Sequence, residues 1–176
     1  MQRQKLEKFK CELTTREYSL IGQSITANFP SGFPDAALKV QLEFVERRSE
    51  IINSKDKEVL LSPYMCNGII ATYFACLEVS DLTDIPEGMI GFTLPAQTYA
   101  KINCTNKSIG EAYDRIFKWM SEKGYVQRFL ENTFPIEIFY FEENVEEDYS
   151  KYQQQEESSG FQLGEVIGDQ LNKLKN

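Results

Sequence analysis

Histidine is absent from the 176 residues of this chain, and tryptophan occurs only once. Without an imidazole, the chain has no base for Ser-His-Asp or Cys-His nucleophilic catalysis, so these enzyme classes are excluded. Four cysteines occur with no Cys-x-x-Cys spacing, at Cys11, Cys66, Cys76 and Cys104. Dispersed cysteines without histidine argue against a structural zinc site. We expect neither a metal nor another cofactor.

Long apolar runs are missing as well. No stretch approaches the length of a membrane span, and the chain begins Met-Gln-Arg-Gln-Lys rather than with the apolar core of a secretory signal. We therefore expect a cytoplasmic protein with no membrane partner. In a reducing compartment its cysteines would be small buried hydrophobic residues.

Basic residues are in the minority, since 19 Lys and Arg stand against 27 Asp and Glu, for a net charge of −8. Nucleic-acid binding begins when Lys and Arg neutralise phosphates, so this balance opposes DNA and RNA as direct partners. The largest basic cluster, Arg47-Arg48, ends a predicted helix, where it complements the helix dipole. An acidic protein attracts cations instead.

The sequence does contain enough apolar residues for one core, because 41% of them are hydrophobic and 12% are aromatic. We expect an N-terminal extension over residues 1–14, with the periodicity of a short helix, and one domain over residues 15–142. An acidic linker should occupy residues 143–176, and its end has the spacing of a docking helix.

Within the domain, hydrophobic patterning predicts strands, helices and their ends. We expect strands over residues 17–29, 89–105 and 133–143, and a strand pair within 59–79 that turns near Pro63 or Asn67-Gly68. Helices are expected over 35–52 and 108–122. For the second, Ser108 and Glu111 suggest a capping box and Gly124 a left-handed stop. The order suggests an α+β fold in which two βαββ units form one antiparallel sheet.

Glu137 is the main candidate for a functional residue, because it lies within the apolar run FPIEIFYF. Strand alternation places it on one face with Phe139 and Phe141. A carboxylate among aromatic rings suits a lipophilic cation, since it supplies charge beside apolar and cation–π surface. The alternative is an acid on an exposed face or paired with a lysine.

Other ligand-binding candidates come from residues predicted to lie near the same sheet. In the strand 69–79, one face carries Tyr73 with alanines and aliphatic residues, and the other carries Phe74 and Glu78. Glu78 adjoins a polar loop, where an acid is easily solvated. Trp119 and Tyr99 are further candidates, although each is also compatible with a place in the core.

The order and spacing of these segments resemble the GyrI-like small-molecule-binding domain, the effector-binding domain of AraC-type and multidrug-responsive transcription regulators. The resemblance covers residues 15–142 and rests on the segments EYSLIGQSITANF, GIIATYFACLEV, IPEGMIGFTLPAQTYAKINC, SIGEAYDRIFKWMSEKGY and FPIEIFYF. It implies two βαββ units with helices on one side of the sheet and a ligand cleft on the other. It also implies that Glu137 matches the acid at the floor of the pocket, which meets cationic aromatic compounds.

Three functions remain open from the sequence. The first is a stand-alone module that binds a hydrophobic, cationic small molecule, since no DNA-binding domain precedes the first predicted strand. The second, suggested by one branch of the resembling family, is a hydrolase that opens electrophilic rings, with Glu137 as general acid or base. The third is a protein-interaction module similar to gyrase inhibitors. An acid within reach of a tyrosine hydroxyl would favour catalysis over binding alone.

Overall fold

The computed structural model of the chain describes residues 9–127 and 134–141. Its strands are β1 (Cys11–Asn28), β2 (Val59–Cys66), β3 (Ile70–Glu78), β4 (Ile90–Ile102) and β5 (Ile136–Tyr140). Its helices are α1 (Asp35–Arg47) and α2 (Ile109–Glu122), with the 3-10 turns η1 (Arg48–Glu50) and η2 (Asn106–Ser108). The α+β class predicted from the sequence is confirmed.

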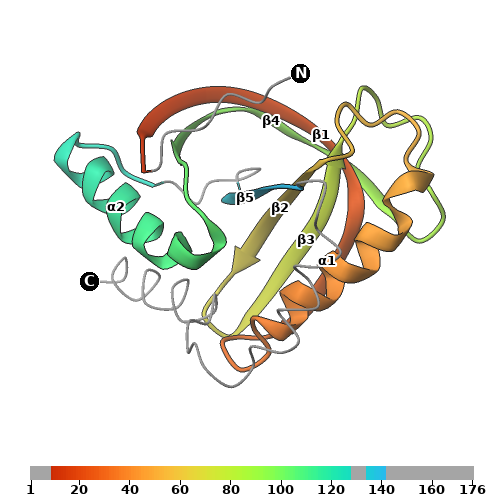
Figure 1. The fold of residues 1–176 in the computed structure, drawn as a ribbon, viewed down its shortest axis with the longest axis horizontal. Helices are drawn as coiled ribbons and strands as arrows, with labels where there is room; N and C mark the ends of the chain where they lie inside the picture. The colour runs from red at the N-terminus through yellow and green to blue at the C-terminus, as the bar shows by residue number, and fades with distance from the viewer. Residues whose placement is uncertain (1–8, 128–133, 142–176) are drawn as a thin grey trace. The chain divides into compact units, whose positions relative to one another are not determined.

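The strands form one five-stranded sheet in the order β4-β1-β3-β2-β5 (Figure 1). Strand β3 runs antiparallel to β1 and β2, and β5 runs antiparallel to β2. One βαββ unit is present, formed by β1, α1, β2 and β3, and it is followed by β4, α2 and β5. The described residues contain no fourth element that would complete a second βαββ unit.

Internal contacts divide the chain into two compact units, each made of two segments. Among the described residues, one unit holds residues 9–17 and 95–127, which include α2, and we call it the α2 unit. The other holds residues 18–94 and 134–141, which include α1, β2, β3 and β5, and we call it the α1 unit. The division passes through β1 and β4.

The core of the α1 unit forms where α1 packs on one face of β3 (Figure 1). This face consists of the alternating residues that the strand pattern assigned to it, Ala71, Tyr73, Ala75, Leu77 and Val79. Val40 and Phe44 of α1 are almost fully buried against the same cluster. Period-2 alternation on the strand and 3.6-residue spacing on the helix therefore meet in one core.

The β2–β3 hairpin turns at Asn67-Gly68, one of the two places that the sequence offered. Gly68 has φ +84°, which an L side chain rarely adopts. The side-chain oxygen of Asn67 accepts hydrogen bonds of 2.9 Å from the N–H groups of Ile69 and Ile70. Pro63, the other expected turn position, lies inside β2 opposite Ile136.

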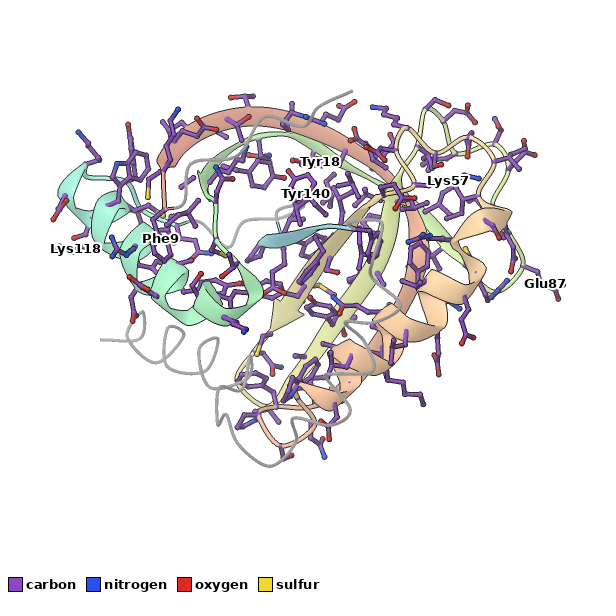
Figure 2. The ribbon with its side chains drawn as sticks, in the orientation of Figure 1. Phe9, Tyr18, Lys57, Glu87, Lys118 and Tyr140 are labelled. Atoms are coloured by element: carbon purple, nitrogen blue, oxygen red, sulfur yellow. The ribbon has the colours of Figure 1, made fainter. Side chains whose placement is uncertain are left out.

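Helix α1 ends earlier than its predicted span of 35–52. The helix stops at Arg47 and the chain continues as a 3-10 turn to Glu50. The Arg47 guanidinium binds both carboxylate oxygens of Glu50 at 2.7 Å and the backbone oxygen of Glu87 at 2.9 Å. Glu87 lies beside this end of α1 in Figure 2. These bonds connect the end of the helix to the loop before β4.

In the α2 unit, the helix begins with a different cap from the predicted one. Thr105 and Ser108 form the capping box of η2, whereas Ser108 makes no side-chain cap to α2. Glu111 pairs instead with Arg115 at 2.6 Å, one turn along α2. The predicted Ser108–Glu111 box is therefore wrong, although Gly124 ends the helix region with φ +74°, as expected.

Strand β1 begins at Cys11, earlier than predicted, so the helical interpretation of residues 1–14 is wrong over its described end. In the α2 unit the hydroxyls of Thr15 and Thr98 lie 3.0 Å apart, between β1 and β4. Such cross-strand bonds stabilise extended backbone over a sequence that has helical periodicity. The predicted acidic linker and docking helix over 143–176 lie outside the described residues, as do residues 1–8. No described helix has both the length and the apolar character needed to cross a membrane.

Candidate functional site

Glu137 is the second residue of β5, and it is only 8% exposed. β5 pairs with β2, and the register sets Glu137 directly opposite Ser62, which is fully buried. Opposite residues of an antiparallel pair point to the same face of the sheet. The side chain of Glu137 therefore lies with that of Ser62 in the α1 unit, where a carboxylate is rare.

Tyr73 of β3 is the hydrogen-bond donor to this carboxylate. Its hydroxyl lies 2.5 Å from Oε2 of Glu137. The Nε2 group of Gln41, on α1, donates to the same hydroxyl oxygen at 3.3 Å. Gln41 is 7% exposed and Tyr73 is 1% exposed. Gln41, Tyr73 and Glu137 thus form a buried chain of two hydrogen bonds, which we call the relay.

The relay places Glu137 on the face of the sheet that α1 covers. This differs from the arrangement implied by the family resemblance, in which the pocket acid lies in a cleft on the face away from the helices. The physical reason is the register of β2 and β5, because Glu137 shares the face of Ser62 and its hydrogen-bond partner Tyr73 packs in the α1 core.

The phenol of Tyr73 stays protonated over an unusually wide pH range. Its complete burial raises its pKa well above the ordinary value, and the negative charge of Glu137 and the hydrogen bond to it raise the pKa further. The nearby Ser62 hydroxyl lowers the pKa of Tyr73, and this effect is smaller than that of burial. Its geometry falls outside that of a normal hydrogen bond with the described residues. Tyr73 is therefore a neutral donor to Glu137 at physiological pH.

Aromatic rings surround Tyr73. The ring of Tyr64 stacks on it, with 6.3 Å between centroids and 13° between planes, and Phe33 packs at 6.5 Å. Tyr64 belongs to β2, two residues after Ser62, and therefore points to the same face. Phe139, two residues after Glu137 on β5, is partly buried against the same core cluster. The acid is thus set among aromatic and apolar groups.

Of the remaining candidates, Phe74 and Glu78 of the α1 unit make their printed contacts with residues other than Glu137. Because side chains alternate along a strand, Phe74 lies on the opposite face of β3 from Tyr73. There its ring packs on that of Phe92, with 5.3 Å between the ring centroids. Glu78 binds the ammonium of Lys55 at 2.8 Å, so the protein itself balances its charge. Tyr99 and Trp119 belong to the α2 unit, where the Trp119 ring packs on Tyr125 at 5.6 Å.

Sequence reasoning missed Gln41, Ser62 and Tyr64 as neighbours of the site. Gln41 carried a usable signal, because it interrupts the apolar stripe of α1 between Val40 and Phe44. Ser62 and Tyr64 alternate with Leu61 and Pro63, so they share a face, yet nothing in the sequence states that β5 pairs with β2. Among the described residues, no three His, Cys, Asp or Glu side chains gather as a metal site would require.

An acid buried among aromatic and apolar groups matches the composition of small-molecule sites, where a few polar groups lie among apolar ones. Residues 23–163 match the family described as Cass2, integron-associated effector binding protein. The match covers most of the chain, so the chain belongs to this family of effector-binding proteins. The resemblance to GyrI-like domains is thereby confirmed, and membership supports small-molecule binding as the class of function.

Two curated relatives are similar to parts of the chain. The small ribosomal subunit protein bS1 homolog of Bacillus subtilis (strain 168) is 30% identical over 152 residues, which cover 78% of this chain and 38% of that protein. The bS1 homolog of Bacillus cereus (strain ATCC 10987 / NRS 248) is 56% identical over 34 residues, which cover 19% of this chain and 9% of that protein. The chain thus spans well under two thirds of the length of these relatives.

Two solved structures are also similar. One is a crystal structure described as a bacterial transcription regulation protein from Staphylococcus aureus MU50, with a TM-score of 0.49, 10% identity, and coverage of 75% of this chain and 96% of that chain. The other is SAV2435 bound to tetraphenylphosphonium, with a TM-score of 0.46, 11% identity, and coverage of 80% of this chain and 98% of that chain.

Proposed function

We propose that this protein binds a hydrophobic cation and that Glu137 is the charge that pairs with it. The single observation that carries the proposal is the buried Glu137 carboxylate, held by Tyr73 beside a stack of aromatic rings. Burying a carboxylate is costly unless other groups stabilise its charge. A bound cation stabilises the buried negative charge, so part of the free energy spent on burying the carboxylate appears as binding affinity.

The relay orients the Glu137 carboxylate for a ligand. Tyr73 donates to Oε2, and its oxygen in turn accepts from Gln41, so the phenol proton is directed at Glu137. This fixes the orientation of the carboxylate before a ligand arrives, which lowers the entropy cost of binding. The Glu137 carboxylate is the group that we assign to the cation.

The position of β5 supports access to this acid. β5 is the last strand in the sheet order, and within the described residues it pairs on one side only, with β2. A ligand that approached from the sheet edge would meet Glu137 first and then the rings of Tyr73 and Tyr64. Such rings supply apolar contact and cation–π attraction for a delocalised aromatic cation.

Calorimetric titration with tetraphenylphosphonium tests the proposal, because this probe combines a permanent charge with aromatic surface. Glu137→Gln keeps the shape and an acceptor for Tyr73 but removes the charge, so it should cost about 2–5 kcal/mol of affinity. Glu46→Gln, on the exposed face of α1, makes the same change in net charge and should leave affinity unchanged. Equal affinities for wild type and Glu137→Gln would refute the role of Glu137.

A second candidate function is hydrolysis of an electrophilic ring, and the short Tyr73–Glu137 hydrogen bond is the observation that favours it. In such a reaction water adds across the strained bond, so a base accepts one proton from water and an acid returns one to the leaving atom. Glu137 can accept the proton from water and, once protonated, return it to the leaving atom, while Tyr73 and Gln41 hold the carboxylate in place. Product formation over many turnovers, lost in Glu137→Gln, would favour this function over binding alone.

A further inference from the structure

Three strands of the α1 unit place polar side chains in one row on the face that α1 covers. Gln23 of β1 lies opposite Ala75 of β3. The β2–β3 register sets Ser62 beside Ala75 on the other side, and Ser62 lies opposite Glu137 of β5. Ala75 is small and fully buried, so the row reads amide, methyl, hydroxyl and carboxylate across the sheet.

Two members of this row have buried polar atoms that the described residues leave without a hydrogen bond. These atoms are Oγ of Ser62 and Oε1 of Gln23. Ser62 is fully buried, on an inner strand between β3 and β5. Buried polar atoms in native proteins nearly always have a partner, and a partner from outside the fold is water or a ligand. Oε1 of Gln23 is a pure acceptor, and Oγ of Ser62 accepts as well as donates.

We propose that Ser62 and Gln23 form a hydrogen-bonding subsite that makes the protein prefer cations with N–H groups over quaternary cations. The inference rests on the proposed function and specifies its ligand class. A primary ammonium or an amidinium can pair with Glu137 and donate an N–H to Ser62 at the same time. A quaternary cation has the charge but no proton to donate, and it leaves both acceptors unpartnered.

The strand spacing sets the expected shape of the ligand. Neighbouring strands lie roughly 5 Å apart, so one cationic nitrogen group can bridge Ser62 and Glu137. Gln23 lies two strand spacings from Ser62, roughly 10 Å away across Ala75. A second N–H donor at that distance from the cationic group would meet the Gln23 oxygen. The side chains of Tyr73 and Tyr64 would then contact the apolar part between the two donors.

The test compares two probes that share one ring system and one positive charge, 4-phenylbenzylammonium and its N,N,N-trimethyl counterpart, in which methyl groups replace the N–H donors; the Ser62→Ala variant separates the loss of N–H donors from the added bulk. Each probe is titrated into wild type, Ser62→Ala, Gln23→Met and the control Ser24→Ala. Ser24 is the matched control, because it is an exposed serine on β1 beside Gln23 and points to the opposite face. The unliganded Ser62→Ala protein should be at least as stable as wild type, because the change removes an unpartnered buried hydroxyl.

We expect wild type to bind the ammonium about tenfold more tightly than the trimethyl probe, as one hydrogen bond to a charged group allows. Ser62→Ala should remove most of that preference, whereas Ser24→Ala should keep it. Because these probes carry one nitrogen group, Gln23→Met should change the affinity for neither of them. It should weaken the binding of a diamine with nitrogens about 10 Å apart by about fivefold.

Equal binding of both probes by wild type, or an undiminished preference in Ser62→Ala, would mean that water alone fills the row. Either result would overturn the inference while the proposed function stands. Failure of every cation to bind would overturn the proposed function and this inference with it.

Discussion

The hydroxyl of Tyr73 donates a 2.5 Å hydrogen bond to Glu137, although the two residues lie 64 positions apart in the sequence. β2 lies between their strands in the sheet, so the bond crosses from β3 to β5 over the face that carries Ser62. It connects the last described strand to the α1 core. The candidate site and the stability of the fold therefore share one interaction, and mutations of Tyr73 report on both.

Tyr73→Phe should lower the free energy of unfolding by about 1–3 kcal/mol. The substitution keeps the ring that stacks on Tyr64 but leaves Glu137 without its phenol donor and Gln41 without an acceptor. Urea denaturation followed by circular dichroism measures the change. Tyr125→Phe is the control, because Tyr125 is 42% exposed and should tolerate the loss of its hydroxyl. A stability loss of the same size in both variants would contradict the buried relay.

Alkaline pH should destabilise the native protein through Tyr73. The pKa of Tyr73 is raised by burial and by Glu137, so the unfolded chain releases this proton near pH 10 while the folded chain retains it. Stability is full below that pH and falls as pH rises toward the higher native pKa, by about 1.4 kcal/mol per pH unit from this group. Urea denaturation between pH 8 and pH 11 measures the slope, which should be shallower in Tyr73→Phe. Identical slopes would show that Tyr73 titrates normally.

Gly22→Ala should destabilise the α1 unit by at least about 2 kcal/mol. A Cβ atom at Gly22 would lie 2.0 Å from the backbone oxygen of Ala75 and 2.7 Å from Cys76, so β1 and β3 would have to separate. Gly91→Ala is the comparison, because its Cβ would meet the flexible end of Ile85 at 2.6 Å, which can move. Thermal unfolding of both variants should show the larger loss for Gly22→Ala. A harmless Gly22→Ala would mean that this strand contact is looser than the structure gives.

Glu78→Gln should leave the affinity for tetraphenylphosphonium within about twofold of wild type, since the Glu78 carboxylate already pairs with an ammonium of the protein itself. Glu78 is balanced by Lys55 at 2.8 Å and lies at the end of β3. The same titration that is applied to Glu137→Gln measures it. A loss of affinity as large as that of Glu137→Gln would contradict this prediction and show that Glu78 contributes to ligand binding.

Neither duplex DNA nor single-stranded RNA should bind with a steep salt dependence. The net charge of −8 leaves too few cationic groups to neutralise a row of phosphates. RNA belongs in the test because the curated relatives are bS1 homologs of the small ribosomal subunit. Fluorescence anisotropy at two salt concentrations is the measurement, and binding that weakens steeply with salt would contradict the prediction.

The sequence predicted the parts of the fold whose patterning is local. Alternation in residues 70–79 identified the face of β3 that joins the main core cluster, and the apolar flanks of Glu137 identified an acid that is buried in the structure. Local capping was less predictable, since Thr105 displaced Ser108 as the first cap residue of this region. Hydroxyl residues three apart offer alternative caps of similar energy, and the backbone path decides between them.

The amino-acid sequence by itself determined that Tyr73 and Glu137 would each lie on an apolar face of a strand, because alternation and hydrophobicity are properties of neighbouring residues. Only the tertiary structure decided that these faces meet. The pairing of β5 with β2 brings Glu137 to Ser62, and the packing of α1 on β3 brings Gln41 to Tyr73. Strand order and helix packing depend on contacts between distant segments, so no local pattern specifies them, and the candidate site exists only where those contacts converge.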